Sequence, residues 1–190
     1  MPEIPPPDPL AEALSVLRGQ KKLAERAMEQ VPDADLHRAL SPGENSIAVI
    51  VQHIAGNQLS RFTEFLTTDG EKPDRQRDGE FEERGLSRAE LLALWERGWG
   101  TLFGALEPLT IADLGRIVTI RGEPHTVLRA AMRQLSHYAT HVGQIVFLAR
   151  HLAGDRWKSL SIPRGGSAEF NRAMGEKHGA GAPPPRKGAR

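Results

Sequence analysis

The sequence predicts an all-α fold: a four-helix bundle with a long crossover connection and a candidate short strand or hairpin before the last helix. Apolar residues recur at spacings of three and four in four separate segments, which is the pattern of amphipathic helices. Stretches rich in Pro, Gly and charged residues separate these segments and stop the helices. Amphipathic helices with no large sheet to cover bury their apolar faces against one another, so the segments predict a bundle.

Each of the four segments carries its own start or stop signal. A capping side chain that accepts a hydrogen bond from the first turn marks a start, while Pro or Gly marks an end. The starts are Asn45 or Ser46, the capping box of Ser87 and Glu90, and Thr126, and the ends are Pro32, Pro108 and Gly154. The predicted helices are residues 10–31, 46–66, 87–106 and 126–152.

Two connecting segments stand out. Residues 67–86 are polar and turn-rich, and this connection is long enough that we expect it to cross over the bundle or to be mobile. Residues 113–123 alternate in the way of a short strand or hairpin arm. Residues 155–175 are predicted to be irregular or to end in a short helix.

Length and composition are those of one soluble domain, which we place at residues 1–174. It begins with a Pro-rich, extended lead-in over residues 1–8. Residues 175–190 are rich in Gly, Pro and basic residues and are predicted to be a disordered, solvated tail. The net charge of +1 favours neither nucleic acid nor a membrane as partner. The chain has no cysteine, no signal peptide and no membrane-length apolar run, so we expect a cytoplasmic protein without thiolate ligands or a Cys nucleophile.

Three histidines are the candidate metal ligands. His137 and His141 are four residues apart, one turn along the same face of the last helix, at the margin of its apolar arc. His53 borders the apolar arc of the second helix, and Asn57 follows it by one turn. If the two margins face each other, three imidazoles converge beside Asn57. Three His ligands with open positions are typical of a catalytic or substrate-binding metal site.

A plainer interpretation of these residues stays open. A His pair at this spacing is also common at the edge of a core or on a surface. Tyr138 follows His137 where a metalloprotease needs Glu, so a protease is excluded. No acid is evidently placed to activate water, so no catalytic residue is assigned. His125, beside Pro124 at a helix start, is expected to be a surface or cap residue.

Other features have two interpretations each. Residues 162–167 include Arg164 and two Gly residues that could hold the anionic group of a cosubstrate, or they form a plain turn with a solvated Arg. Trp95 and Trp99 are spaced to line a pocket, but a core pair is favoured. Asn57 and Arg164 are therefore the candidate cofactor-binding residues.

The chain resembles the DinB-like superfamily of DinB/YfiT-type metalloenzymes, in an uncharacterised branch of domains of unknown function. The resemblance covers about residues 40–170. It is most specific in the single His of the second helix combined with the H-x-x-x-H spacing of the fourth. The matching stretches are residues 45–57, 61–70, 91–99, 118–123, 134–145 and 160–167.

This resemblance implies a four-helix bundle in which His53, His137 and His141 bind a divalent ion, zinc or nickel, and it implies frequent homodimers. It also implies activities that use a low-molecular-weight thiol, which would have to come from a cosubstrate because the chain has no Cys. We therefore expect a metal-dependent enzyme, specifically a thiol-dependent S-transferase acting on a small-molecule electrophile. The alternative is a non-catalytic, stress-related protein that binds a metal or small ligand. A nucleic-acid-binding module is least favoured.

Overall fold

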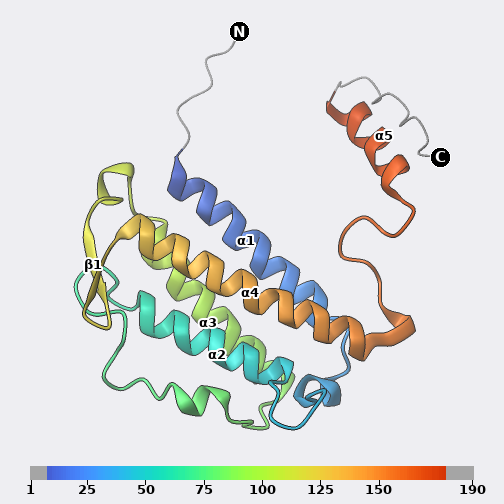
Figure 1. Cartoon of the computed structure of the whole chain (residues 1–190), viewed down its shortest axis with the longest axis horizontal. Helices are drawn as coiled ribbons and strands as arrows, with labels where there is room; N and C mark the ends of the chain where they lie inside the picture. The colour runs from blue at the N-terminus through green and yellow to red at the C-terminus, as the bar shows by residue number, and fades with distance from the viewer. Residues whose placement is uncertain (1–7, 179–190) are drawn as a thin grey trace, which may run out of the picture. The chain divides into compact units, whose positions relative to one another are not determined.

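The computed structural model describes residues 8–178, which are mostly helical with one small antiparallel hairpin (Figure 1). Long helices account for most of the fold, and short 3-10 turns lie between them. The long helices are α1 (Pro9–Met28), α2 (Ile47–Phe62), α3 (Arg88–Leu106) and α4 (Val127–Ala153), the hairpin is β1 (Ile117–Ile120) with β2 (Glu123–Thr126), and α5 (Ser167–His178) follows. The predicted strand or hairpin before the last long helix is thus present.

The capping signals predicted α3 and α4 well. The Ser87 hydroxyl and the Glu90 carboxylate form the expected capping box at the start of α3. The Thr126 hydroxyl accepts a hydrogen bond from the backbone N–H of Arg129 at 3.1 Å, which starts α4. Gly154 then ends α4 with a φ of 54°, a left-handed conformation that glycine adopts readily.

The predicted ends of the first two helices are too late. α1 stops at Met28, before Pro32, because the backbone closes into turns there. α2 stops at Phe62 and not at residue 66, because Glu64 adopts a φ of 49°. A residue in that conformation cannot continue a right-handed helix.

α2 and α3 run side by side in the same direction. The α3 residue Leu91 lies beside Ile47 at the start of α2, and a Cβ on Gly98 would lie 3.0 Å from Cα of Ala55, farther along α2. The chain must therefore return along the length of α2 before α3 begins, as Figure 1 shows for the connection after α2. The returning segment includes a 3-10 turn, η2 (Asp78–Phe81), which contacts α2.

α2 is buried on nearly every side, because α3, α4 and the returning connection surround it. Polar residues of α2, among them His53 and Arg61, are therefore inside the protein with exposed fractions of 4%. The helices α1 and α4 pack against each other, and α1 also contacts α3. Trp95 and Trp99 of α3 are fully buried with ring centroids 5.4 Å apart, which confirms the prediction of a core pair.

The chain divides into two compact units, residues 1–156 and 157–190. The second unit contains α5, which extends to His178, so residues 175–178 are helical where the sequence predicted a disordered tail. The neighbours of Gly175 (Ala173, Met174, Glu176 and Lys177) are good helix formers and offset the low helix propensity of glycine there. The remainder of the predicted tail and the lead-in over residues 1–7 lie outside the described residues, and the domain boundary at 174 stays a prediction. Within residues 8–178, none of the helices combines the length and the apolar character that a membrane span requires.

Candidate metal centre

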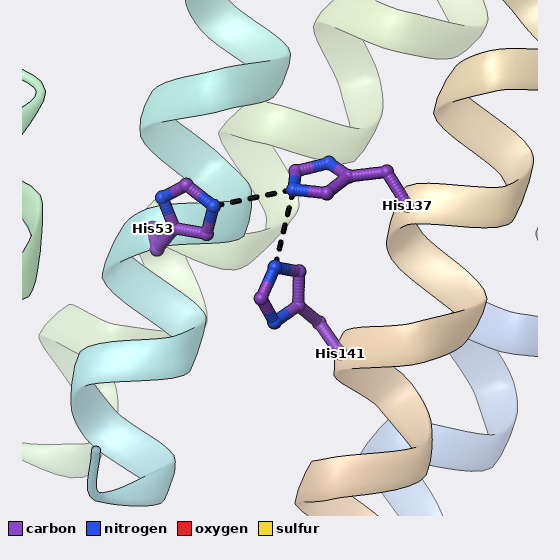
Figure 2. A group of neighbouring side chains, drawn as sticks. All are labelled: His53, His137 and His141. Carbon is purple, nitrogen blue, oxygen red and sulfur yellow. Dashed lines mark hydrogen bonds between the residues drawn. The ribbon is translucent and has the colours of Figure 1, made fainter. Parts of the chain in front are cut away.

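Three histidines from two helices meet at one point. His53 comes from α2, whereas His137 and His141 come from α4, and Figure 2 shows their rings turned toward one another between the two helices. The Nε2 atom of His137 lies 3.3 Å from Nε2 of His53 and 3.1 Å from Nε2 of His141. One nitrogen from each ring lies within 4.8 Å of the other two. The structure therefore brings together all three candidate metal ligands.

These separations suit nitrogen atoms that share one small cation. A tetrahedral zinc ion with Zn–N bonds of about 2.0–2.1 Å holds two ligand nitrogens about 3.3 Å apart. Neutral imidazole binds a metal through the nitrogen that carries a lone pair and no proton. Lone pairs that face one another at this distance repel, and a cation between them removes the repulsion. The donor set and its spacing therefore fit a divalent ion such as zinc or nickel.

Hydrogen bonds on the far side of two rings determine which nitrogen faces the meeting point. Nδ1–H of His53 donates to Oε2 of Glu80 at 2.9 Å, since an ionised carboxylate can only accept. Nδ1–H of His141 donates to Oε1 of Gln144 at 2.8 Å. Both Nε2 atoms are left with their lone pairs exposed to a metal, which is how histidine ligands are usually oriented. Nδ1 of His137 is buried without a hydrogen-bond partner among the described residues.

Glu80 is the residue of this site that the sequence did not reveal. It lies in η2, and Arg75 holds its carboxylate through two hydrogen bonds, Nε to Oε1 at 2.7 Å and Nη2 to Oε2 at 2.8 Å. Gly56 of α2 makes room for it, because a Cβ there would lie 2.5 Å from Oε1 of Glu80. Glu80 is 27 residues from His53 in an irregular segment, so no helical period predicts the contact. The glycine one turn after His53 was the only local signal.

Burial disfavours protonated histidine at this site. It lowers the pKa of His137 to about 3, and the neighbouring His141 and His53 add to the effect. Burial also lowers the pKa of His141, although its hydrogen bond to Gln144 opposes the change. Burial alone would raise the pKa of Glu80, but hydrogen bonds from His53 and Arg75 outweigh it and lower that pKa. At neutral pH His137 and His141 are thus neutral and Glu80 is ionised, the states that metal binding needs.

Two cavities flank the triad. One of about 210 Å³ is lined by His53, His137 and Asn57, so Asn57 lies in the pocket wall as predicted, while its role in cofactor binding stays a prediction. The buried Oδ1 of Asn57 accepts a hydrogen bond from the hydroxyl of Tyr138 at 2.9 Å. The other cavity, of about 740 Å³, is lined by residues that include Gln144, the partner of His141.

In a comparison with protein-family models, residues 8–166 match the family described as "Protein of unknown function (DUF1572)". The match spans most of the chain, including α1 to α4 and all three histidines. The chain belongs to the DUF1572 family. No curated protein matches it. The description of the DUF1572 family names no activity.

Two further predictions concern residues outside the triad of this DUF1572 protein. The prediction for His125 is wrong: it lies in β2 and is only 3% exposed. Glu123, two residues earlier on the same face, is exposed, so the burial of His125 depends on its place nearer α4, which β2 contacts. Nε2 of His125 lies 3.5 Å from a carboxylate oxygen of Glu123. Arg164 belongs to the second unit, and its predicted part in cofactor binding stays untested.

Proposed function

We propose that this DUF1572 protein is a metal-dependent enzyme of the DinB-like superfamily, in which α1 to α4 form a four-helix bundle around a divalent ion. The observation that supports this most directly is the meeting of three Nε2 atoms, two of them oriented by hydrogen bonds to Glu80 and Gln144. Two neighbouring helices, α2 and α4, supply the ligands, as facing helices do in bundle metal sites.

His53, His137 and His141 would hold zinc or nickel and leave further coordination positions for a substrate. When bound, the ion would supply a Lewis acid that lowers the pKa of a coordinated thiol. The proposed reaction is transfer of a low-molecular-weight thiol to a small-molecule electrophile. The residues of the chain hold the ligands rigidly: the charged hydrogen bond of Glu80 fixes the ring of His53, and Arg75 fixes Glu80.

One observation favours the alternative, a non-catalytic protein that binds a metal or a small ligand. Glu80 is the carboxylate in contact with the triad, and it is already engaged by His53 and Arg75. Those hydrogen bonds lower its pKa, which makes it a poor general base. A transferase that uses a thiolate does not need a strong protein base, so the S-transferase proposal stands beside this alternative.

Metal analysis of the purified protein tests the metal proposal. We expect about one zinc or nickel ion per chain in the wild type, and a large loss in His141→Ala. His151→Ala is the matched control, since His151 lies on the same helix and is exposed. Equal metal content in all three proteins, or none in any, would refute the metal site.

A turnover assay distinguishes the enzyme from the alternative, a non-catalytic protein that binds a metal or a small ligand. The metal-loaded protein is incubated with a chromogenic electrophile and a panel of cellular thiols, and thioether formation is followed with and without a chelator. Conjugation that disappears with the chelator and with His141→Ala supports the transferase. Metal binding without conjugation across the panel supports the binder. We also propose that the protein is a homodimer, as the resemblance implies, and light scattering on the same preparation tests this.

A further inference from the structure

Five arginines converge on the 210 Å³ cavity beside the triad. They come from four separate segments: α2, the returning connection, the turn of the hairpin and α4. The described residues that line this cavity include no carboxylate. The arginines are Arg61, Arg75, Arg77, Arg121 and Arg133.

We infer that this cavity binds an oxyanion, the carboxylate or phosphate group of a small molecule. The inference deepens the proposed function, because it names the substrate class of the metal site: an anionic molecule whose charged group lies in the arginine cavity while the rest reaches the triad. His53 and His137 line the cavity, so the two sites share a wall. Arginine is suited to this role because its planar guanidinium binds carboxylate and phosphate through paired hydrogen bonds.

The charges around the cavity are not balanced. Glu71 is shared by Arg61, Arg75 and Arg121, whose nitrogens lie 2.8, 3.1 and 3.2 Å from its Oε2. Arg75 also forms an ion pair with Glu80, which is not among the residues that line the cavity. Within residues 8–178, no acidic side chain pairs with Arg133. Arg77 lies 3.6 Å from Oδ1 of Asp78, whose side chain is fully exposed to solvent. The five arginines thus outnumber the three carboxylates paired with them, so positive charge is in excess and an anion in the cavity would offset it.

Two side chains that line the cavity each have a buried polar atom with no partner among the described residues. These atoms are Nε of Arg61, a donor, and Oε1 of Gln134, an acceptor, and both residues are 4% exposed. Buried polar groups are nearly always hydrogen-bonded, so each unpaired atom points to a missing partner. An oxyanion would satisfy Arg61, and an amide, amine or hydroxyl group beside it would satisfy Gln134. The ligand we infer carries both.

The fold keeps the arginines in place. The turn between β1 and β2 has Arg121 and Gly122 at φ values of 56° and 75°, the conformation of a tight two-residue hairpin turn. The Asp69 carboxylate fixes this turn by accepting the backbone N–H groups of both residues at 2.8 Å. Arg121 is thus held at the cavity by its backbone as well as by its ion pair. At about 210 Å³ the cavity is smaller than the ~300–1,000 Å³ of drug-sized pockets, which favours a small anionic group.

Calorimetric titration with inorganic phosphate and with succinate tests the inference. The titrations use the full chain, once loaded with zinc and once treated with a chelator. Arg133→Gln and the double variant Arg121→Gln/Arg133→Gln remove cavity charge, whereas Arg129→Gln removes a charge one turn away on α4, from a side chain that is 67% exposed. We expect the cavity variants to weaken binding of one or both anions by about tenfold or more, as lost charge-assisted hydrogen bonds do, and Arg129→Gln to leave binding unchanged.

The two arms distinguish this inference from the proposed function. Anion binding to the chelated protein that is lost in the cavity variants supports the inference even if zinc does not bind. Anion binding that requires zinc and is equal in the cavity variants and in Arg129→Gln overturns it, because the ion would then hold the anion alone. Zinc binding without any binding of phosphate or succinate also overturns it, while the metal proposal survives.

Discussion

Replacing Glu80 by Gln isolates the contribution of the carboxylate behind His53. The change keeps the shape of the side chain and removes its charge, so Nδ1–H of His53 loses a charge-assisted acceptor at 2.9 Å. The side chains of Glu80 and His53 are 10% and 5% exposed, so solvent screens the contact little. Removing such a partner of a metal-binding His weakens metal affinity by about 10- to 100-fold, or about 1.4–2.7 kcal/mol. For Glu80→Gln we expect a loss of zinc affinity in the upper half of that range.

The assay is a competition for zinc between the protein and a chelating dye, and the matched control is Glu82→Gln. Glu82 lies two residues away on the same connection and is exposed, so its variant changes the net charge equally without touching the triad. We expect Glu80→Gln to fold, since Arg75 keeps Glu71 as an ion-pair partner, and circular dichroism checks this. Zinc affinities of the two variants that agree within about twofold would refute the role of Glu80 as an orienting partner.

Three other predictions rest on single contacts. Gly56→Ala places a Cβ 2.5 Å from Oε1 of Glu80, so the carboxylate must move and zinc affinity should fall by about tenfold in the dye assay. The pKa of His137 is about 3 in the folded chain and 6.5 ordinarily, so between these pH values the unfolded state binds more protons than the folded state. The free energy of unfolding of the metal-free protein should therefore fall as the pH drops from 6.5 toward 3, and urea titrations should show a smaller fall in His137→Gln. Gly98→Ala puts a Cβ 2.4 Å from a buried glutamine oxygen and should destabilise the fold by about 1–3 kcal/mol, whereas Gly100→Ala on the same helix meets nothing within 4 Å and should not; equal denaturation midpoints would contradict this.

Sequence patterns predicted those parts of the structure that depend on neighbouring residues. The starts of α3 and α4 follow from caps whose donors and acceptors lie within three residues of each other. The three histidines could be proposed as one set because two of them share a helical turn and the third borders an apolar arc. The placement of the long helices followed from the same periodicity.

The parts that the sequence did not predict depend on contacts between distant segments. The end of α2 is set by Glu64, whose positive φ has no signature in its side chain. Glu80 reaches His53 only because the connection returns along α2, a matter of tertiary structure. His125 looked like a surface residue because its burial depends on the packing of β2 against α4. The arginine cavity could not be predicted either, since four segments contribute to it.

The connection that the sequence predicted to cross over the bundle or to be mobile therefore shapes the site most. The connection between α2 and α3 covers α2, orients His53 through Glu80 and contributes Arg75 and Arg77 to the cavity. Three neutral imidazoles would leave the charge of a divalent ion largely uncompensated, and among residues 8–178 only Glu80 places a carboxylate against one of these rings. The arginines add to this positive potential, and a low-dielectric wall strengthens it. A site of this charge selects anions and stabilises the deprotonated form of any acid that enters it, which is the physical link between the metal proposal and the oxyanion inference.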